Sequence, residues 1–244
     1  MRVAPLVFCL CLPLSADGLS DLRAALQKLH GAEPVKASLE YDFWRQTTED
    51  KKPVVSQGKA TAQVEDGAQG LRITWAHPLL QQAAQESKAQ LQQPDQSTPT
   101  RTALRGVDVV DVAEDLNHAE ALLRDLDQAQ LQEEKAETWQ GHPARLLVLK
   151  LSPRIPASQK KYLKELKVDA KVWVGADGLP LAYASAVSFK GSRFFISFEG
   201  ANSQERQFTH IGGRLVVTRT TSEDRSAGMG MNTLNKKVTT LTIL

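Results

Sequence analysis

Histidines and clustered acids are the residues of this chain whose types suit metal binding or acid–base chemistry. The closest approach to a metal-ligand pair is Glu114 with His118, which lie one helical turn apart. The remaining histidines are scattered along the chain, at positions 30, 77, 142 and 210. We interpret Glu114 and His118 as part of a solvated helix, and we predict no metal site.

A further group of acids lies in the segment VDVVDVAED, at Asp108, Asp111, Glu114 and Asp115. A calcium loop places oxygen ligands around a tight turn that contains a glycine, and this segment has none. Acids are favoured in the first turn of a helix because of the helix dipole. The segment therefore predicts a charged helix N-terminus.

The chain lacks the local patterns of nucleophilic and nucleotide-dependent enzymes. No serine stands in a G-x-S-x-G elbow. The glycines of AGMGMN, residues 227–232, lack a P-loop lysine and a following helix, so they predict a hairpin loop. No strand is followed by a dinucleotide fingerprint. We therefore expect a protein that is not an enzyme and that needs no cofactor.

Residues 1–16, MRVAPLVFCLCLPLSA, have the pattern of a secretory signal peptide, in which Arg2 precedes an apolar run too short to span a membrane. The alternative is a buried N-terminal strand or helix. Both cysteines, Cys9 and Cys11, lie in this segment, so disulfides and cysteine-ligated zinc are excluded after it. Loss of Arg2 changes the formal charge from +2 to +1, which argues against a nucleic-acid partner. We predict an exported, periplasmic protein that is a monomer.

The segment SQKKYLKELK, residues 158–167, is strongly basic. Lys160, Lys161, Lys164 and Lys167 alternate with Tyr162 and two leucines. Such a segment suits contact with an anionic lipid headgroup or an acidic partner. The alternative is a solvated connection between two strands.

The elements that must position these residues follow from the hydrophobic periodicity. SDLRAALQKLHG predicts a short amphipathic helix, and residues 79–135, rich in Gln, Ala and Leu, predict further helices. Alternation of apolar and polar residues, with glycine turns at short intervals, predicts antiparallel strands elsewhere. The expected strands cover residues 37–43, 59–64, 71–75, 144–151, 168–174, 181–190, 193–199, 204–210, 214–221 and 236–244. This is an α+β fold: a large curved antiparallel sheet, an open half-barrel of about ten strands, with about three helices over its concave face.

One strand carries a row of small residues, Ala182, Ala184 and Ala186. Small residues on a curved sheet leave volume, and apolar neighbours keep that volume suited to acyl chains, each methylene of which gains about 0.8 kcal/mol on burial. The alternative is that the alanines let a helix pack closely on the sheet. The sequence leaves both interpretations open.

Several segments resemble the LolA-like family of periplasmic lipoprotein carriers. ASLEYDFWRQ and GKATAQVEDGAQGLRITWAHPL are similar to its first strands, and WQGHPARLLVLKL and KVWVGADGLPLAYASAVSFKG are similar to later ones. The matching positions in the first strands are Gly58, Leu71, Arg72, Trp75 and Pro78. The resemblance implies a half-closed antiparallel barrel with a helical lid, an apolar cavity for acyl groups and no catalytic residue. This chain departs from the family after Pro78, where the helical region replaces further strands.

The first hypothesis is therefore a single domain, residues 17–244, with a helical insertion at 79–135, that carries or binds a lipid or an acylated lipoprotein in an apolar cavity. The second is an envelope protein-interaction or sensing module whose core is filled by side chains. For the first hypothesis the expected lining is Leu39, Tyr41, Phe43, Leu71, Ile73, Trp75, Trp173, Ala184, Ala186, Phe194 and Ile196.

Overall fold

The computed structural model describes residues 17–152, 155–194 and 196–244, which form one antiparallel sheet of ten strands together with six helices. The signal peptide predicted for residues 1–16 lies outside the described residues. The strands are β1 (Val35–Glu49), β2 (Lys52–Gly67), β3 (Gly70–Trp75), β4 (Gln130–Trp139), β5 (His142–Lys150), β6 (Leu163–Val174), β7 (Pro180–Arg193), β8 (Ile196–Ile211), β9 (Arg214–Gly228) and β10 (Met231–Ile243). The helices are α1 (Gly18–Leu26), α2 (His77–Gln92), α3 (Pro99–Gly106), α4 (Val109–Asp115), α5 (Ala119–Leu126) and α6 (Ala157–Lys160).

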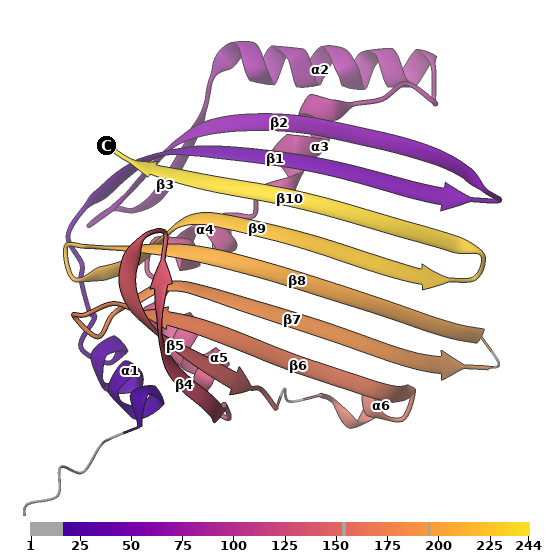
Figure 1. Cartoon of the computed structure of the whole chain (residues 1–244). Helices are drawn as coiled ribbons and strands as arrows, with labels where there is room; N and C mark the ends of the chain where they lie inside the picture. Colours follow the sequence, from indigo (N-terminus) through magenta and orange to yellow (C-terminus); the bar gives the residue numbers. More distant parts are fainter. Residues whose placement is uncertain (1–16, 153–154, 195) are drawn as a thin grey trace, which may run out of the picture.

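The sheet is open and has two edge strands (Figure 1). Its strand order is β3-β2-β1-β10-β9-β8-β7-β6-β5-β4, so the last strand of the chain pairs with the first. All other neighbours are also neighbours in sequence, as expected of antiparallel strands joined by short hairpins. The predicted α+β architecture, a curved antiparallel half-barrel of about ten strands, is confirmed.

The strands follow the expected period of two. In β1, Ala37, Leu39 and Tyr41 are buried while Ser38 and Glu40 between them are partly exposed. Side chains on alternate positions of a strand point to opposite faces. Each strand therefore contributes one set of residues to each face of the sheet.

The helices pack on one face of the sheet, which we call the covered face; its residues include Leu39, Val172 and Tyr183. The opposite face, which includes Trp173 and Ala182, we call the open face. On the covered face α1 and α5 pack over β5, β6 and β7, while α3 and α4 pack over β1, β2 and β10. The described helices contain none that is long and apolar enough to cross a membrane.

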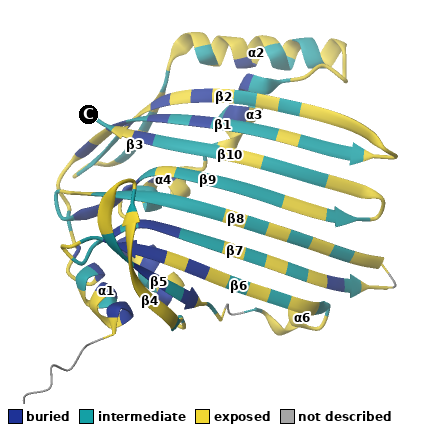
Figure 2. Ribbon diagram, viewed as in Figure 1, coloured by how far each residue is buried: buried dark blue, intermediate teal, exposed yellow. Residues whose placement is uncertain are grey.

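Burial is concentrated at one end of the sheet. Figure 2 shows the buried positions gathered where the helices lie, while the far ends of the long strands are intermediate or exposed. The far ends carry the hairpins between β1 and β2, β9 and β10, and β7 and β8. We call this side of the sheet the hairpin edge. The helices thus cover only part of the sheet.

The open face has a small apolar cluster of its own. The Trp139 ring of β4 lies 4.6 Å from the Trp173 ring of β6, and Ala182 of β7 is fully buried beside them. Trp173 and Ala182 are register partners, so the small side chain leaves room for the large one. This contact folds the β4–β5 hairpin over the open face.

Three details of the sequence prediction were wrong. The helical region ends at Leu126, and Gln130–Trp139 is an edge strand although its Gln, Glu, Lys and Ala suit a helix. The region also forms four separate helices, so the described residues contain six helices in place of about three. The expected strands 193–199 and 204–210 are one strand, β8, which begins at Ile196, and Arg193 ends β7. Gly200 does not end that strand; a Cβ there would lie 2.5 Å from the Phe189 ring, so the glycine allows a close cross-strand approach.

Candidate functional site

A cavity of about 780 Å³ lies on the covered face, between the end of α5 and the middle of β6, β7 and β8. Its volume is in the range of pockets that hold small ligands. The apolar part of its wall is Leu123, Leu151, Val168, Tyr183 and Val187. Its polar part is Arg124, Asp125, Asp127, Gln128, Ser152, Ser185, Asn202 and Gln204. The cavity therefore has an apolar wall on the sheet and a charged rim on the helix.

The floor of this cavity continues into an apolar row that no helix covers. Val168 of β6 is the register partner of Val187 of β7, and the next pair toward the hairpin edge on the same face is Leu166 with Phe189. The Phe189 ring lies 6.3 Å from that of Phe198 on β8. All five side chains are partly exposed. The covered face thus offers a continuous apolar surface from the cavity toward the hairpin edge.

A charged cluster lies beside the cavity, under α4 and α5. The Arg206 guanidinium of β8 is 3.9 Å from the carboxylate of Asp125. Burial raises the pKa of Asp115 to about 7, although Arg206 attracts the charged form. Burial also raises the pKa of Asp125, again against Arg206. Asp115 is therefore a group that changes charge near neutral pH, next to an arginine that is largely removed from solvent.

Two other titratable groups of this region stay neutral at ordinary pH. His118 is buried and stacks on the Phe208 ring at 5.6 Å. Burial, together with the positive charge of Arg206, lowers the pKa of His118 to about 3. Burial raises the pKa of Tyr183 to about 12. The interpretation of His118 as part of a solvated helix is wrong: it is the N-cap residue before α5, and its side chain is buried.

The described residues contain no group of three or more His, Cys, Asp or Glu placed to hold a metal ion. Asp108 of the acidic segment instead caps α4, because its carboxylate accepts a hydrogen bond of 2.7 Å from the Val110 amide. Glu114 forms an ion pair of 2.6 Å with Arg124. These acids hold the short helices in place.

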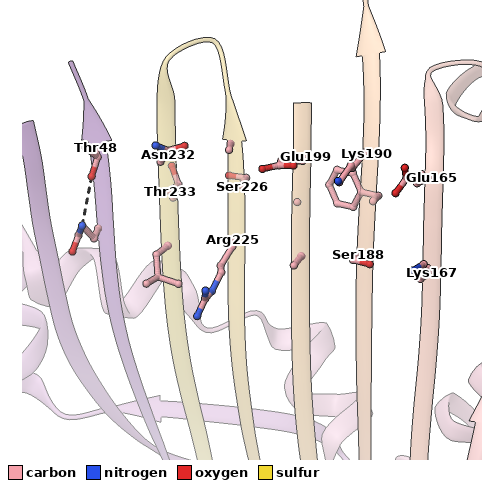
Figure 3. Close-up of a pocket in the computed structure, with 16 residues that line it drawn as sticks. Thr48, Glu165, Lys167, Ser188, Lys190, Glu199, Arg225, Ser226, Asn232 and Thr233 are labelled. Atoms are coloured by element: carbon pink, nitrogen blue, oxygen red, sulfur yellow. Dashed lines mark hydrogen bonds between the residues drawn. The ribbon is translucent and has the colours of Figure 1, made fainter. Parts of the chain in front are cut away.

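The open face carries two further hollows of about 650 Å³ each. The one nearer the hairpin edge is lined by Lys167, Arg225 and other polar side chains, and Lys190 of β7 stands between Glu165 of β6 and Glu199 of β8 (Figure 3). The other is lined by Ala184 and Ala186 together with Lys171, Glu205 and other charged residues. Both hollows therefore combine charged side chains with apolar surface.

The structure divides the predicted lining between the two faces. Six of its residues lie on the covered face or at its edge, in or against the cluster under α3 and α4: Leu39, Tyr41, Phe43, Leu71, Ile73 and Trp75. Trp173 and Ala184 belong to the cluster of the open face, and Ala186 lines an open-face hollow. Phe194 and Ile196 lie at the turn between β7 and β8, with 77% and 43% of their surfaces exposed. The alanine row therefore faces away from the helices.

Sequence reasoning missed the apolar wall of the covered-face cavity. Val187 alternates with the alanines along β7, and Val168 is its register partner in β6. Both valines therefore lie on the face opposite to the alanines. The sequence of β7 contained a signal of this wall, because the residues that alternate with the alanines include three large side chains, Tyr183, Val187 and Phe189. Which set meets the helices depends on register across the sheet, and the sequence of one strand does not contain that information.

Comparison with known proteins adds little to this description. No family model matches the chain, and no curated protein matches it. Among solved structures, a DUF1329 family protein from Desulfovibrio piger is 12% identical, with 90% of this chain and 89% of that chain covered, at a TM-score of 0.25. MucB, solved in complex with MucA(peri), is 10% identical, with 92% of this chain and 93% of that chain covered, at a TM-score of 0.18. Superpositions this loose carry no argument about the site.

Proposed function

We propose that this chain is a non-enzymatic binding protein of the cell envelope that carries a lipid or an acylated partner on its covered face. The observation that carries the proposal is the cavity of about 780 Å³ between α5 and the sheet, with its continuation into the row of Val168, Val187 and Phe189. An acyl chain laid along this surface removes apolar area from water, at roughly 25 cal/mol per Å². The charged rim at Arg124 and Asp125 would meet the polar end of the ligand.

The proposed location is the periplasm, and the proposed state is a monomer. The location rests on the signal-like sequence of residues 1–16, and the role rests on the cavity and on the resemblance of the strand segments to lipoprotein carriers. Fractionation of cells that produce the full chain, followed by sizing of the mature protein, tests both points. A full-length cytoplasmic product would contradict the location.

The central experiment is extraction and mass spectrometry of lipids from the natively purified protein, together with titration of a fluorescent fatty acid. Val187→Trp places a large ring into the covered-face cavity. Ala186→Trp, its neighbour in β7, places the same ring into the open-face hollow and serves as the matched control. We expect Val187→Trp to lose lipid and Ala186→Trp to retain it, with thermal unfolding of both variants measured in parallel. Absence of lipid and of fatty-acid affinity in the wild-type protein would overturn the proposal.

A second function is favoured by a separate observation, the charged hollows of the open face. A protein-interaction module would use these hollows for a polypeptide while the clusters under the helices serve only as a core. In that case Ala186→Trp, and not Val187→Trp, would abolish crosslinking to an envelope protein. The same pair of variants therefore separates the two functions.

A further inference from the structure

Three neighbouring hairpins of the sheet carry exposed apolar side chains at or near their turns. The β1–β2, β9–β10 and β7–β8 turns lie on one edge, because Glu49 pairs with Met231 and Phe198 pairs with Gly228. Figure 1 shows them in a row at the far ends of the long strands. Each hairpin carries two large apolar residues that are mostly or substantially exposed: Val54 and Val55, Met229 and Met231, and Phe194 and Ile196.

The exposure of these side chains is unusual for a soluble surface. Val54, Phe194 and Met229 have 68%, 77% and 82% of their surfaces exposed. Single exposed apolar residues need no explanation, but apolar residues gathered at one place mark a contact surface. Here they stand at or within a few residues of three turns that share one edge of the sheet.

Unpaired cations surround one end of this row. Tyr162, which follows α6, is partly exposed. The Lys161 ammonium lies 4.9 Å and the Arg193 guanidinium 5.1 Å from the centre of its ring. Arg193 also lies 5.2 Å from the Phe194 ring. More cations of this corner have no salt-bridge partner within the described part of the chain: Lys160, Lys164 and Lys190. Glu165 and Glu199 are the acids nearest to them in sequence, so the corner is net positive.

We infer that the hairpin edge docks on an anionic lipid bilayer, with the apolar tips inserted into the interface and the lysines and arginines at the level of the headgroups. Aromatic and long basic side chains together are the residues that anchor proteins at that level. Each Lys or Arg near an anionic surface contributes attraction, and each apolar tip contributes buried area. The observation that favours a membrane is the combination of the two features, cations and an aromatic ring next to exposed apolar side chains, which matches the layered headgroup and acyl regions of an anionic bilayer. None of these hairpin residues lines the covered-face cavity, although the apolar row of Val168, Val187 and Phe189 runs toward the same edge, so the hairpin variants test docking separately from the proposed function.

The test is flotation of the purified protein with phosphatidylcholine vesicles, with and without phosphatidylglycerol. We expect binding to the anionic vesicles, weakened by salt. The double variant Phe194→Ser, Met229→Ser should bind about ten-fold more weakly. Lys160→Ala with Lys161→Ala should lose roughly five-fold per lysine. Thermal unfolding checks that these exposed substitutions leave the fold intact.

The matched control is Leu91→Ser, which removes an equally exposed apolar side chain, 87% exposed, from α2. We expect it to bind anionic vesicles as the wild-type protein does. Failure of the wild-type protein to float with anionic vesicles overturns the inference. Equal loss in the Leu91 and the hairpin variants also overturns it, as does capture of a protein partner by the hairpin edge without vesicle binding.

Discussion

Asp66 and Arg214 form an ion pair of 2.5 Å although 148 residues separate them in the chain. Asp66 lies near the end of β2 and Arg214 begins β9, and two strands, β1 and β10, lie between β2 and β9 in the sheet. Both side chains are largely removed from solvent, with 24% and 6% exposed. The pair therefore ties together two strands that do not hydrogen-bond to each other.

We predict that Asp66→Ala destabilises the protein by about 3 kcal/mol, because it leaves a buried guanidinium without its counter-charge. Denaturant unfolding measures the change. The double variant Asp66→Ala, Arg214→Met should recover part of the loss, since replacing both partners by apolar groups avoids the buried charge. A single variant as stable as the wild-type protein would contradict the role of the pair.

The second prediction concerns Gly58, where α3 approaches β2. A Cβ at this position would lie 2.4 Å from the carbonyl oxygen of Pro99 and 2.8 Å from the Phe43 ring. Gly58→Ala should cost roughly 1–3 kcal/mol through overpacking. Gly67→Ala, in the same strand, is the control, because its Cβ would meet only Pro34 at 3.5 Å. Equal stability of the two variants in thermal denaturation would refute the close approach.

The third prediction is a pH dependence at Asp115. Its pKa is raised from 3.8 to about 7 in the folded protein, so the folded state holds the proton more tightly than the unfolded state. Stability from this group is therefore lost as the pH rises from about 4 to about 7. Asp115→Asn should raise the melting temperature by a few degrees at pH 8 and by less at pH 5. An increase that is the same at both values would mean that the carboxyl does not titrate in this window.

The fourth prediction is an acid dependence at His118 with the opposite sign. The folded-state pKa is lowered from 6.5 to about 3, so the unfolded state takes up the proton first as the pH falls. Stability from this group is full above pH 6.5 and is lost progressively below it. His118→Phe keeps the ring contact with Phe208 and removes the titration, so its stability should fall less between pH 7 and pH 4.5. Circular dichroism during acid titration measures this. If the variant and the wild-type protein lose stability equally between pH 7 and pH 4.5, the prediction is wrong.

The sequence was sufficient for the sheet and insufficient for the site. Alternation in β1 predicted the buried set of Leu39 and Tyr41, and the Asp177-Gly178 turn predicted the β6–β7 hairpin; Gly178 has a φ of +80° there. The face that meets the helices could not be predicted for Ala184 and Ala186, because it depends on which side of the sheet α1 and α5 pack against, and the alternation within β7 does not contain that information. Residues 130–135 of β4 were assigned to the helical region because they favour helices locally, whereas pairing with β5 decides their structure.

The two edge strands have a consequence for the behaviour of the molecule at high concentration. An open sheet exposes unpaired backbone groups at both sides, and such borders recruit further chains into fibrils unless something blocks them. At one border β3 offers only six residues. At the other, β4 carries Glu133, Glu134, Lys135 and Glu137 and has an irregularity between Leu131 and Glu133, so charge and a broken ladder oppose stacking. The half-barrel can thus resist edge-to-edge association although its sheet is not closed into a complete barrel.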